Sequence, residues 1–67
     1  MTFQDFLRMV SRGQKVEVEI ELYGRTFLTR AVAFDFLTNK EEESAKLREL
    51  HVLKVGITGG VLAVKLG

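Results

Sequence analysis

Residues 15–22, KVEVEIEL, alternate strictly between apolar and charged side chains. Successive side chains of a strand point to opposite faces, so one face is apolar and the other carries a row of glutamates. Such alternation is typical of an antiparallel strand with one face on the core and the other in water. The segment therefore predicts a half-buried strand. Solvation explains its glutamates better than metal binding or acid–base chemistry does.

The chain has few means of stabilising the sheet that this strand requires. It has 67 residues, no cysteine and one histidine, so we expect a single domain over 1–67. A domain of this size buries only about 60% of the surface of its unfolded chain. Disulfides are excluded, and one histidine without any cysteine makes a structural zinc site very improbable. Oligomerisation is the remaining means, and the apolar share of 46% favours it.

The charge balance limits the partners that the chain can have. Ten basic and nine acidic residues give a formal charge of +1, whereas phosphate binding needs a field of one sign. Any nucleic-acid site has to be local, or repeated around an oligomer. No apolar run approaches the roughly 20 residues of a membrane span, and no secretion signal is evident. We therefore expect a cytoplasmic protein with no membrane partner.

The first residues have the pattern of an amphipathic helix. Thr2 and Asp5 have the spacing of a capping box. One apolar stripe follows at helical spacing: Phe3, Phe6, Leu7 and Val10. The pattern predicts a helix over 2–12 that Gly13 ends.

Residues 38–50 favour a second short helix. Glu41 to Glu43 suit a helix N-terminus, and Lys46 and Arg48 suit its C-terminus. All residues from 40 to 50 except Ser44 are good helix formers. An extended strand and loop is the alternative for this segment.

The segment that follows the turn YGR (23–25) is apolar on both faces. In a strand over 26–36, one face carries Phe27, Ala31 and Ala33, and the other carries Leu28, Val32, Phe34 and Phe36. Arg30 interrupts the second face, where we expect it to pair with Glu17 or Glu19 across the hairpin. Both faces need a cover, which a strongly bent strand in a small barrel or a subunit interface would provide.

The last residues predict a hairpin around a two-residue turn at Gly59–Gly60. Its register places three apolar pairs on one face: Ile57 with Leu62, Val55 with Val64, and Leu53 with Leu66. Gly56 then opposes Ala63 on the other face, beside Val52 and Val61. A glycine inside a strand marks a place of close approach.

The order of these elements resembles the Sm-like (LSm) family nearly end to end, as a single Sm-like domain over 1–67. The family's first motif is matched by Val18, Ile20, Leu22, Gly24, Arg25, Phe27, Ala31, Ala33, Phe34, Asp35 and Asn39, with small shifts. Its second motif is matched by Ile57, Gly59 and the apolar strand after them. The resemblance implies a mainly β fold: an N-terminal α-helix followed by a strongly bent antiparallel sheet that closes as an Sm-like small barrel.

The resemblance also implies a homo-oligomeric ring of about five to seven subunits, closed by edge strands and able to bind single-stranded RNA or nucleotides. The residues implied to contact RNA are Asp35, Leu37, Asn39, Thr58 and Gly59. Arg25, Arg30 and Lys54 are candidate phosphate contacts. Leu37 stands where the family has a stacking ring, and Thr58 stands where it has an arginine. The fold is therefore better supported than RNA binding, and no cofactor or metal is expected.

Two alternatives stay open. One is a small homo-oligomeric interaction module without nucleic-acid binding, of the kind found among accessory proteins of viruses or mobile elements. The near-neutral charge and the missing arginine at position 58 favour it. The other is an unrelated two-layer α+β fold with four strands and two helices.

An enzyme is not expected. His51 is the only histidine, and Ser11 and Ser44 have no recognisable base beside them. The glycine-rich stretch GITGG is too short for a phosphate-binding loop. The sequence therefore offers no catalytic residue.

Overall fold

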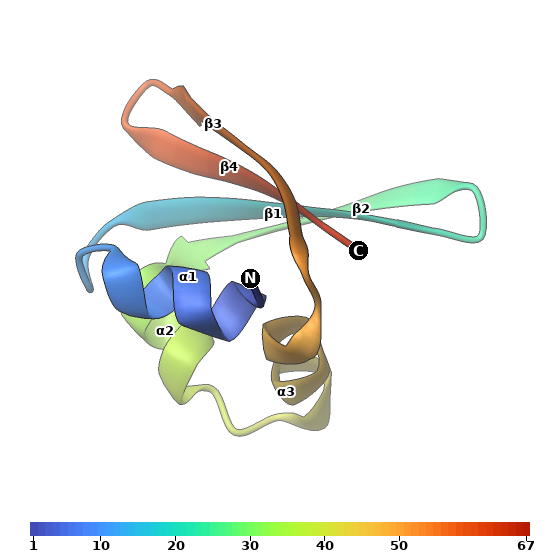
Figure 1. The fold of residues 1–67 in the computed structure, drawn as a ribbon, viewed down its shortest axis with the longest axis horizontal. Coiled ribbons are helices and arrows are strands. Elements are labelled where there is room, and N and C mark those ends of the chain that lie inside the picture. The colour runs from blue at the N-terminus through green and yellow to red at the C-terminus, as the bar shows by residue number, and fades with distance from the viewer.

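The computed structural model describes residues 1–67 and shows one four-stranded sheet with helices against one of its faces (Figure 1). The elements are α1 (Phe3–Met9), β1 (Lys15–Leu22), β2 (Arg25–Val32), α2 (Ala33–Thr38), α3 (Glu42–Glu49), β3 (Val52–Thr58) and β4 (Val61–Leu66). The strand order is β2-β1-β4-β3, with two antiparallel hairpins joined by parallel pairing of β1 with β4. The fold is mainly β with an N-terminal helix.

The sheet is open rather than closed into a barrel. β2 and β3 each have one neighbour, so both are free edges. The prediction of a wholly antiparallel sheet is wrong, because the helical crossover between the hairpins lets β4 run parallel to β1. The strand number and the two layers agree with the two-layer alternative, although the structure has three helices instead of two.

Helix α1 begins where the sequence predicts and ends earlier. Thr2 is its N-cap, and its Oγ1 accepts a hydrogen bond from the backbone N–H of Asp5 at 3.2 Å. The helix was expected to reach residue 12, but it ends at Met9. Val10 already has an extended backbone, with φ −102° and ψ 161°. Gly13 is therefore not its terminator.

The predicted strand over 26–36 is wrong in its second half. β2 ends at Val32, and the next residues form α2. The backbone N–H of Ala33 donates to the carbonyl of Gln14 at 2.9 Å, which holds the start of α2 beside the chain that leads into β1. A helix brings Ala33 and Phe36, three residues apart, to the same face, and both are buried.

Helix α3 (Glu42–Glu49) confirms the short helix predicted within 38–50. Glu42 and Glu43 lie in its first turn, and Lys46 and Arg48 lie in its last turn. These charges complement the helix dipole. The alternative of an extended strand and loop in this segment is therefore wrong, and the next strand begins only at Val52.

The C-terminal hairpin has the predicted turn and most of the predicted register. Gly59 and Gly60 have φ of 57° and 78°, as a two-residue turn of this type requires. The pairs Ile57–Leu62, Val55–Val64 and Gly56–Ala63 are confirmed. The pair Leu53–Leu66 is wrong: a bulge makes Leu53 an extra residue, and Val52 faces Leu66 instead.

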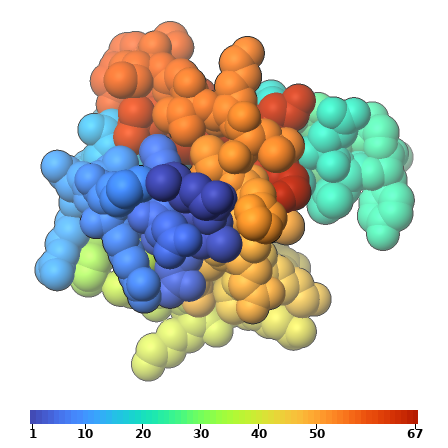
Figure 2. Space-filling model, viewed as in Figure 1, coloured from blue at the N-terminus to red at the C-terminus, as the bar shows by residue number.

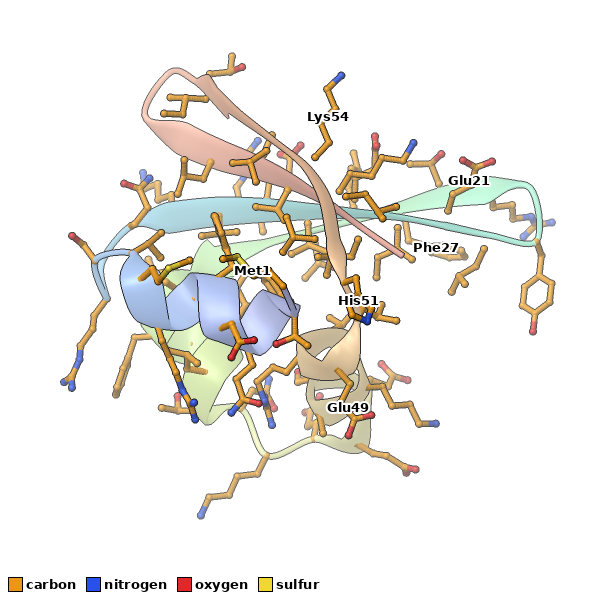
Figure 3. All side chains as sticks on the ribbon, in the orientation of Figure 1. Met1, Glu21, Phe27, Glu49, His51 and Lys54 are labelled. Carbon is orange, nitrogen blue, oxygen red and sulfur yellow. The ribbon has the colours of Figure 1, made fainter.

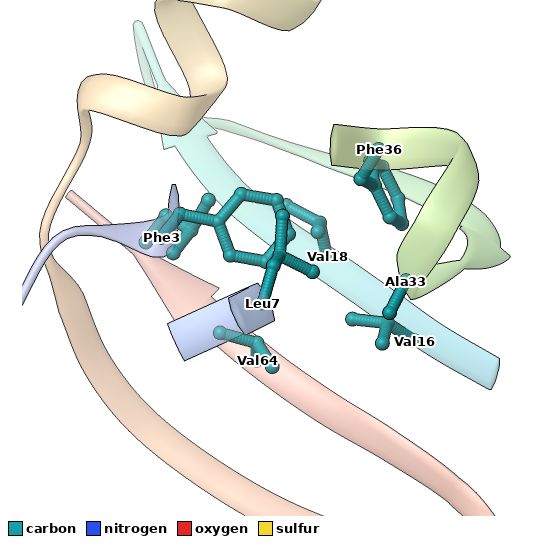
Figure 4. Close-up of a cluster of buried hydrophobic side chains, with 8 residues drawn as sticks. Phe3, Leu7, Val16, Val18, Ala33, Phe36 and Val64 are labelled. Carbon is teal, nitrogen blue, oxygen red and sulfur yellow. The ribbon is translucent and has the colours of Figure 1, made fainter. Parts of the chain in front are cut away.

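The core lies between the helices and the two central strands (Figure 4). Its eight buried residues are Phe3, Leu7, Val16, Val18, Ala33, Phe36, Val64 and Leu66. The rings of Phe3 and Phe36 meet edge to face, with centroids 5.3 Å apart. Ten large hydrophobic side chains stay exposed, so the chain leaves more large apolar residues in water than it buries.

Candidate protein-interaction surface

The free edge of β3 offers unpaired backbone groups. Thr58 and Val61 flank the two-residue turn and form a hydrogen-bonded pair. Bonded and non-bonded pairs alternate along an antiparallel ladder, so Gly56 also bonds to β4. Val55 and Ile57 therefore direct their N–H and C=O groups out of the sheet. Such groups are a template for another strand.

The side chains along this edge are apolar and exposed. Ile57 is 74% exposed, Leu53 61% and Val55 43%. Val55 and Ile57 lie opposite Val64 and Leu62, on the face of the sheet that the helices cover. The helices reach the central strands but leave the outer strand β3 in water. An apolar row thus runs along unpaired backbone.

The N-terminus protects only the beginning of this edge. The N–H of Val52 donates to the carbonyl of Met1 at 2.9 Å, and the N–H of Phe3 donates to the carbonyl of Leu50 at 2.8 Å. Residues 1–3 therefore occupy the edge beside 50–52 and stop there. The edge beyond Val52 has no partner strand within the chain.

A second apolar surface lies at the end of the β1–β2 hairpin. Residues 22–28, here called the hairpin arm, project beyond the helices and the rest of the sheet (Figure 2). Tyr23 is fully exposed, Leu28 is 61% exposed, and Leu22 and Phe27 are each 50% exposed. The prediction of a strand that is apolar on both faces is only partly right, because Phe34 and Phe36 of its second face lie in α2. At the arm, Phe27 and Leu28 on opposite faces of β2 are both exposed.

Tyr23 has a left-handed backbone. Its φ is 53°, and it is the only non-glycine residue with a positive φ. Turns of this kind favour Asn-Gly or Gly-Gly, because a side chain in the left-handed region costs about 1–2 kcal/mol. An aromatic ring held in water on a strained backbone has no role within the fold.

The face of the sheet away from the helices, here called the open face, carries both signs of charge. Glu21 and Lys54 point away from the helices, whereas Phe27 lies on their side (Figure 3). Arg30 pairs with Glu17, with 3.1 Å between Nε and Oε2, which confirms the predicted cross-hairpin pair. A shallow hollow over Gly56 and Ala63 is bordered by Glu17, Glu19, Lys54 and Lys65. No group of acidic or histidine side chains is placed to hold a metal ion.

The residues implied to bind RNA lie in three separate places. Arg25 opens β2 at the arm, while Thr58 and Gly59 lie at the tip of the other hairpin. Parallel pairing of β1 with β4 puts these two tips at opposite ends of the sheet. Asp35 and Asn39 belong to α2 and its C-terminal cap. One subunit does not bring them together.

Two of these residues have contacts within the fold. Leu37 is half-buried and packs against the core. The side-chain Oδ1 of Asn39 accepts a hydrogen bond from the backbone N–H of Glu41 at 2.9 Å. The backbone carbonyl of Asn39 accepts one from Nη1 of Arg48 at 2.8 Å. Asn39 therefore shapes the connection between α2 and α3.

The sequence reasoning missed three residues that this geometry singles out. Arg48 of α3 donates to the backbone carbonyl of Phe36 in α2. Gln14 donates from Nε2 to the backbone carbonyl of Gly60 at 2.8 Å, which connects the β3–β4 turn to the start of β1. Neither contact has a sequence signal, because the partners are backbone carbonyls. Tyr23 did have a sequence signal, because it precedes Gly24 in a two-residue turn, where Asn is usual.

Comparison of the chain with protein-family models, with curated proteins and with solved structures finds no match. No helix has the length and apolar character needed to cross a membrane.

Proposed function

We propose that this chain is a small homo-oligomeric protein-interaction module that does not bind nucleic acid. The observation that supports this function most is the distribution of its exposed apolar side chains. Seven of the ten belong to the hairpin arm, which contains the start of the edge strand β2, or to the other edge strand β3. Scattered exposed hydrophobics are ordinary, whereas rows of them beside unpaired strands are typical of interaction surfaces.

The thin core supports the same proposal. Eight buried residues give a 67-residue chain a small hydrophobic contribution to its stability. Burying a large aliphatic side chain adds about 1.5–3 kcal/mol when it is complete. Covering β3 in an assembly would thus add stability that is large relative to the total for a domain of this size.

The charges weigh against nucleic acid as the partner. The open face has a central row of glutamates, Glu17, Glu19 and Glu21, between Arg30 on one side and Lys54 and Lys65 on the other. A phosphate backbone facing this row would meet carboxylates at its centre. The row favours a neutral or mixed-charge protein surface instead.

The RNA-binding ring of the Sm-like type is the second candidate. The two free edges favour it, because pairing β2 of one subunit with β3 of the next would be a head-to-tail contact, which can close into a ring. The sheet is mixed and open instead of an antiparallel barrel, and the implied RNA contacts lie apart in one subunit. The interaction module therefore has the stronger support.

Light scattering after size exclusion tests the proposal, with the absorbance ratio at 260 and 280 nm recorded on the same peak. We expect a mass above the 7.6 kDa of one chain and no nucleic acid. The protein should be loaded from about 1 μM to about 1 mM, because interfaces formed by short strands are weak. A single-chain mass at every concentration would overturn the proposal. A five- to seven-fold assembly that carries RNA would favour the ring.

A further inference from the structure

Gly56 stands in the middle of β3 without a reason inside the chain. Its φ is not positive, so the backbone does not require glycine. A Cβ placed there would meet no atom within 4 Å, so no neighbour in the chain requires it either. Glycine weakens a strand, and in one it often marks a bulge, a bend or a place where a ligand or another backbone approaches closely. The bulge of β3 lies at Leu53 and not at Gly56, so the close approach is by a group from outside this chain.

The regular part of β3 is short and bounded on both sides. The bulge ends the regular register before Lys54, and the turn begins after Thr58. Residues 1–3 also block the edge beside 50–52. A strand that pairs with this edge therefore has five residues, 54–58, available to it. Their midpoint is Gly56.

An antiparallel copy of the same segment fits this edge without a clash of charge. With Gly56 opposite itself, Lys54 faces Thr58 of the second copy rather than another lysine. Val55 faces Ile57 on the helix-covered face, in both halves of the interface. Val55 and Ile57 supply the outward N–H and C=O groups, so these apolar pairs are also the hydrogen-bonded ones.

The glycine then falls at the position that needs it most. Gly56 and its copy form a non-hydrogen-bonded pair, in which the Cα atoms approach to about 4.5 Å and side chains are most crowded. A register centred one residue earlier would pair Ile57 with Leu53 in the bulge. A register centred one residue later would pair Val55 with the turn residue Gly59.

We propose that two copies of this chain pair β3 with β3 about a twofold axis at Gly56, joining their sheets into one continuous sheet. This inference rests on the proposed function and names its first partner: a second copy of the chain. The hairpin arm of each subunit stays free at the outer ends of the joined sheet, because β2 is the far edge from β3.

Single cysteines test the register, and the chain has no native cysteine to interfere. G56C should form an interchain disulfide under mild oxidation, since Cα atoms about 4.5 Å apart are within disulfide range. K54C alone should not, because its copy lies about 14 Å away in this register. An equimolar mixture of K54C and T58C should give mostly the mixed disulfide. Equal cross-linking of all single variants, or none of G56C, would overturn the pairing.

A lysine substitution on each free edge, I57K on β3 and L28K on β2, distinguishes a failure of the β3–β3 interface from a failure of the proposed homo-oligomer. I57K, at a side chain already 74% exposed, should give the mass of one chain by light scattering at a concentration where wild type is a dimer. L28K, the matched change on β2, should stay dimeric. Circular dichroism of both variants should match that of wild type, which checks that they are folded. An oligomer that L28K breaks and I57K does not would refute the β3 interface while leaving a homo-oligomer in place. A monomeric wild type would refute both.

Discussion

Arg48 donates from Nη1 to the backbone carbonyl of Asn39 and to that of Phe36, each at 2.8 Å, and so ties α3 to the end of α2. The carbonyls at a helix C-terminus have no partner within the helix, and this guanidinium supplies one. The contact holds the crossover that brings β4 alongside β1.

Replacing Arg48 with methionine should therefore destabilise the fold. The substitution keeps a long apolar stem but leaves two carbonyls without a charged donor, and the free energy of unfolding should fall by about 1–3 kcal/mol. Urea denaturation followed by circular dichroism measures it. Lys46→Met is the matched control, because Lys46 makes only an exposed pair with Glu42 at 3.7 Å and should change stability by less than about 0.5 kcal/mol. Equal effects of the two substitutions would contradict the role of Arg48.

Tyr23→Asn should stabilise the chain. Asparagine tolerates the left-handed backbone that Tyr23 adopts at φ 53°, and the side chain of Tyr23 is fully exposed, so no packing is lost. The free energy of unfolding should rise by about 0.5–1 kcal/mol. Thr26→Asn, in the regular part of β2, is the control and should not stabilise. A loss of stability in Tyr23→Asn would show that the ring makes a contact within the protein.

Asn39→Ala distinguishes a structural role from RNA binding. The side chain accepts from the N–H of Glu41, so its loss should lower the free energy of unfolding by about 1 kcal/mol. Asn39→Asp keeps the acceptor and should retain most of that stability. Fluorescence anisotropy with labelled oligo-U and oligo-A should show no binding by wild type. Binding by wild type that Asn39→Ala weakens, with the fold unchanged, would instead support the Sm-like site.

Local sequence patterns predicted β1, α1 and α3, because the side chains of each segment fit either a strand or a helix and not both. The alternation around Val18 predicted β1, the stripe from Phe3 predicted α1, and the charges from Glu42 to Arg48 predicted α3. The pattern predicts a strand for residues 33–36, which are helical, because Ala33, Phe34 and Phe36 suit either a strand or a helix period. The sequence of β2 contains no glycine or proline near Val32 that would indicate the end of the strand there.

The pairing of β1 with β4 could not be predicted from the sequence. Val16 and Leu62 are apolar residues on one face in either a parallel or an antiparallel arrangement, so the pattern does not encode the direction of the neighbour. The bulge at Leu53 also has no local signal, and it moved Val52 onto the other face. The candidate surface was predicted in part: the sequence indicated that Phe27 and Leu28 lie on opposite faces of a strand and that Gly56 lies opposite Ala63.

Amide hydrogen exchange at the edge of β3, followed by NMR at several protein concentrations, tests the central claim most directly. In one chain the N–H groups of Val55 and Ile57 point into water, whereas pairing with a second copy bonds them. Their protection should rise with protein concentration, while the outward N–H groups of Thr26 and Leu28 on β2 should stay unprotected. Fast exchange at Val55 and Ile57 at every concentration would contradict the account.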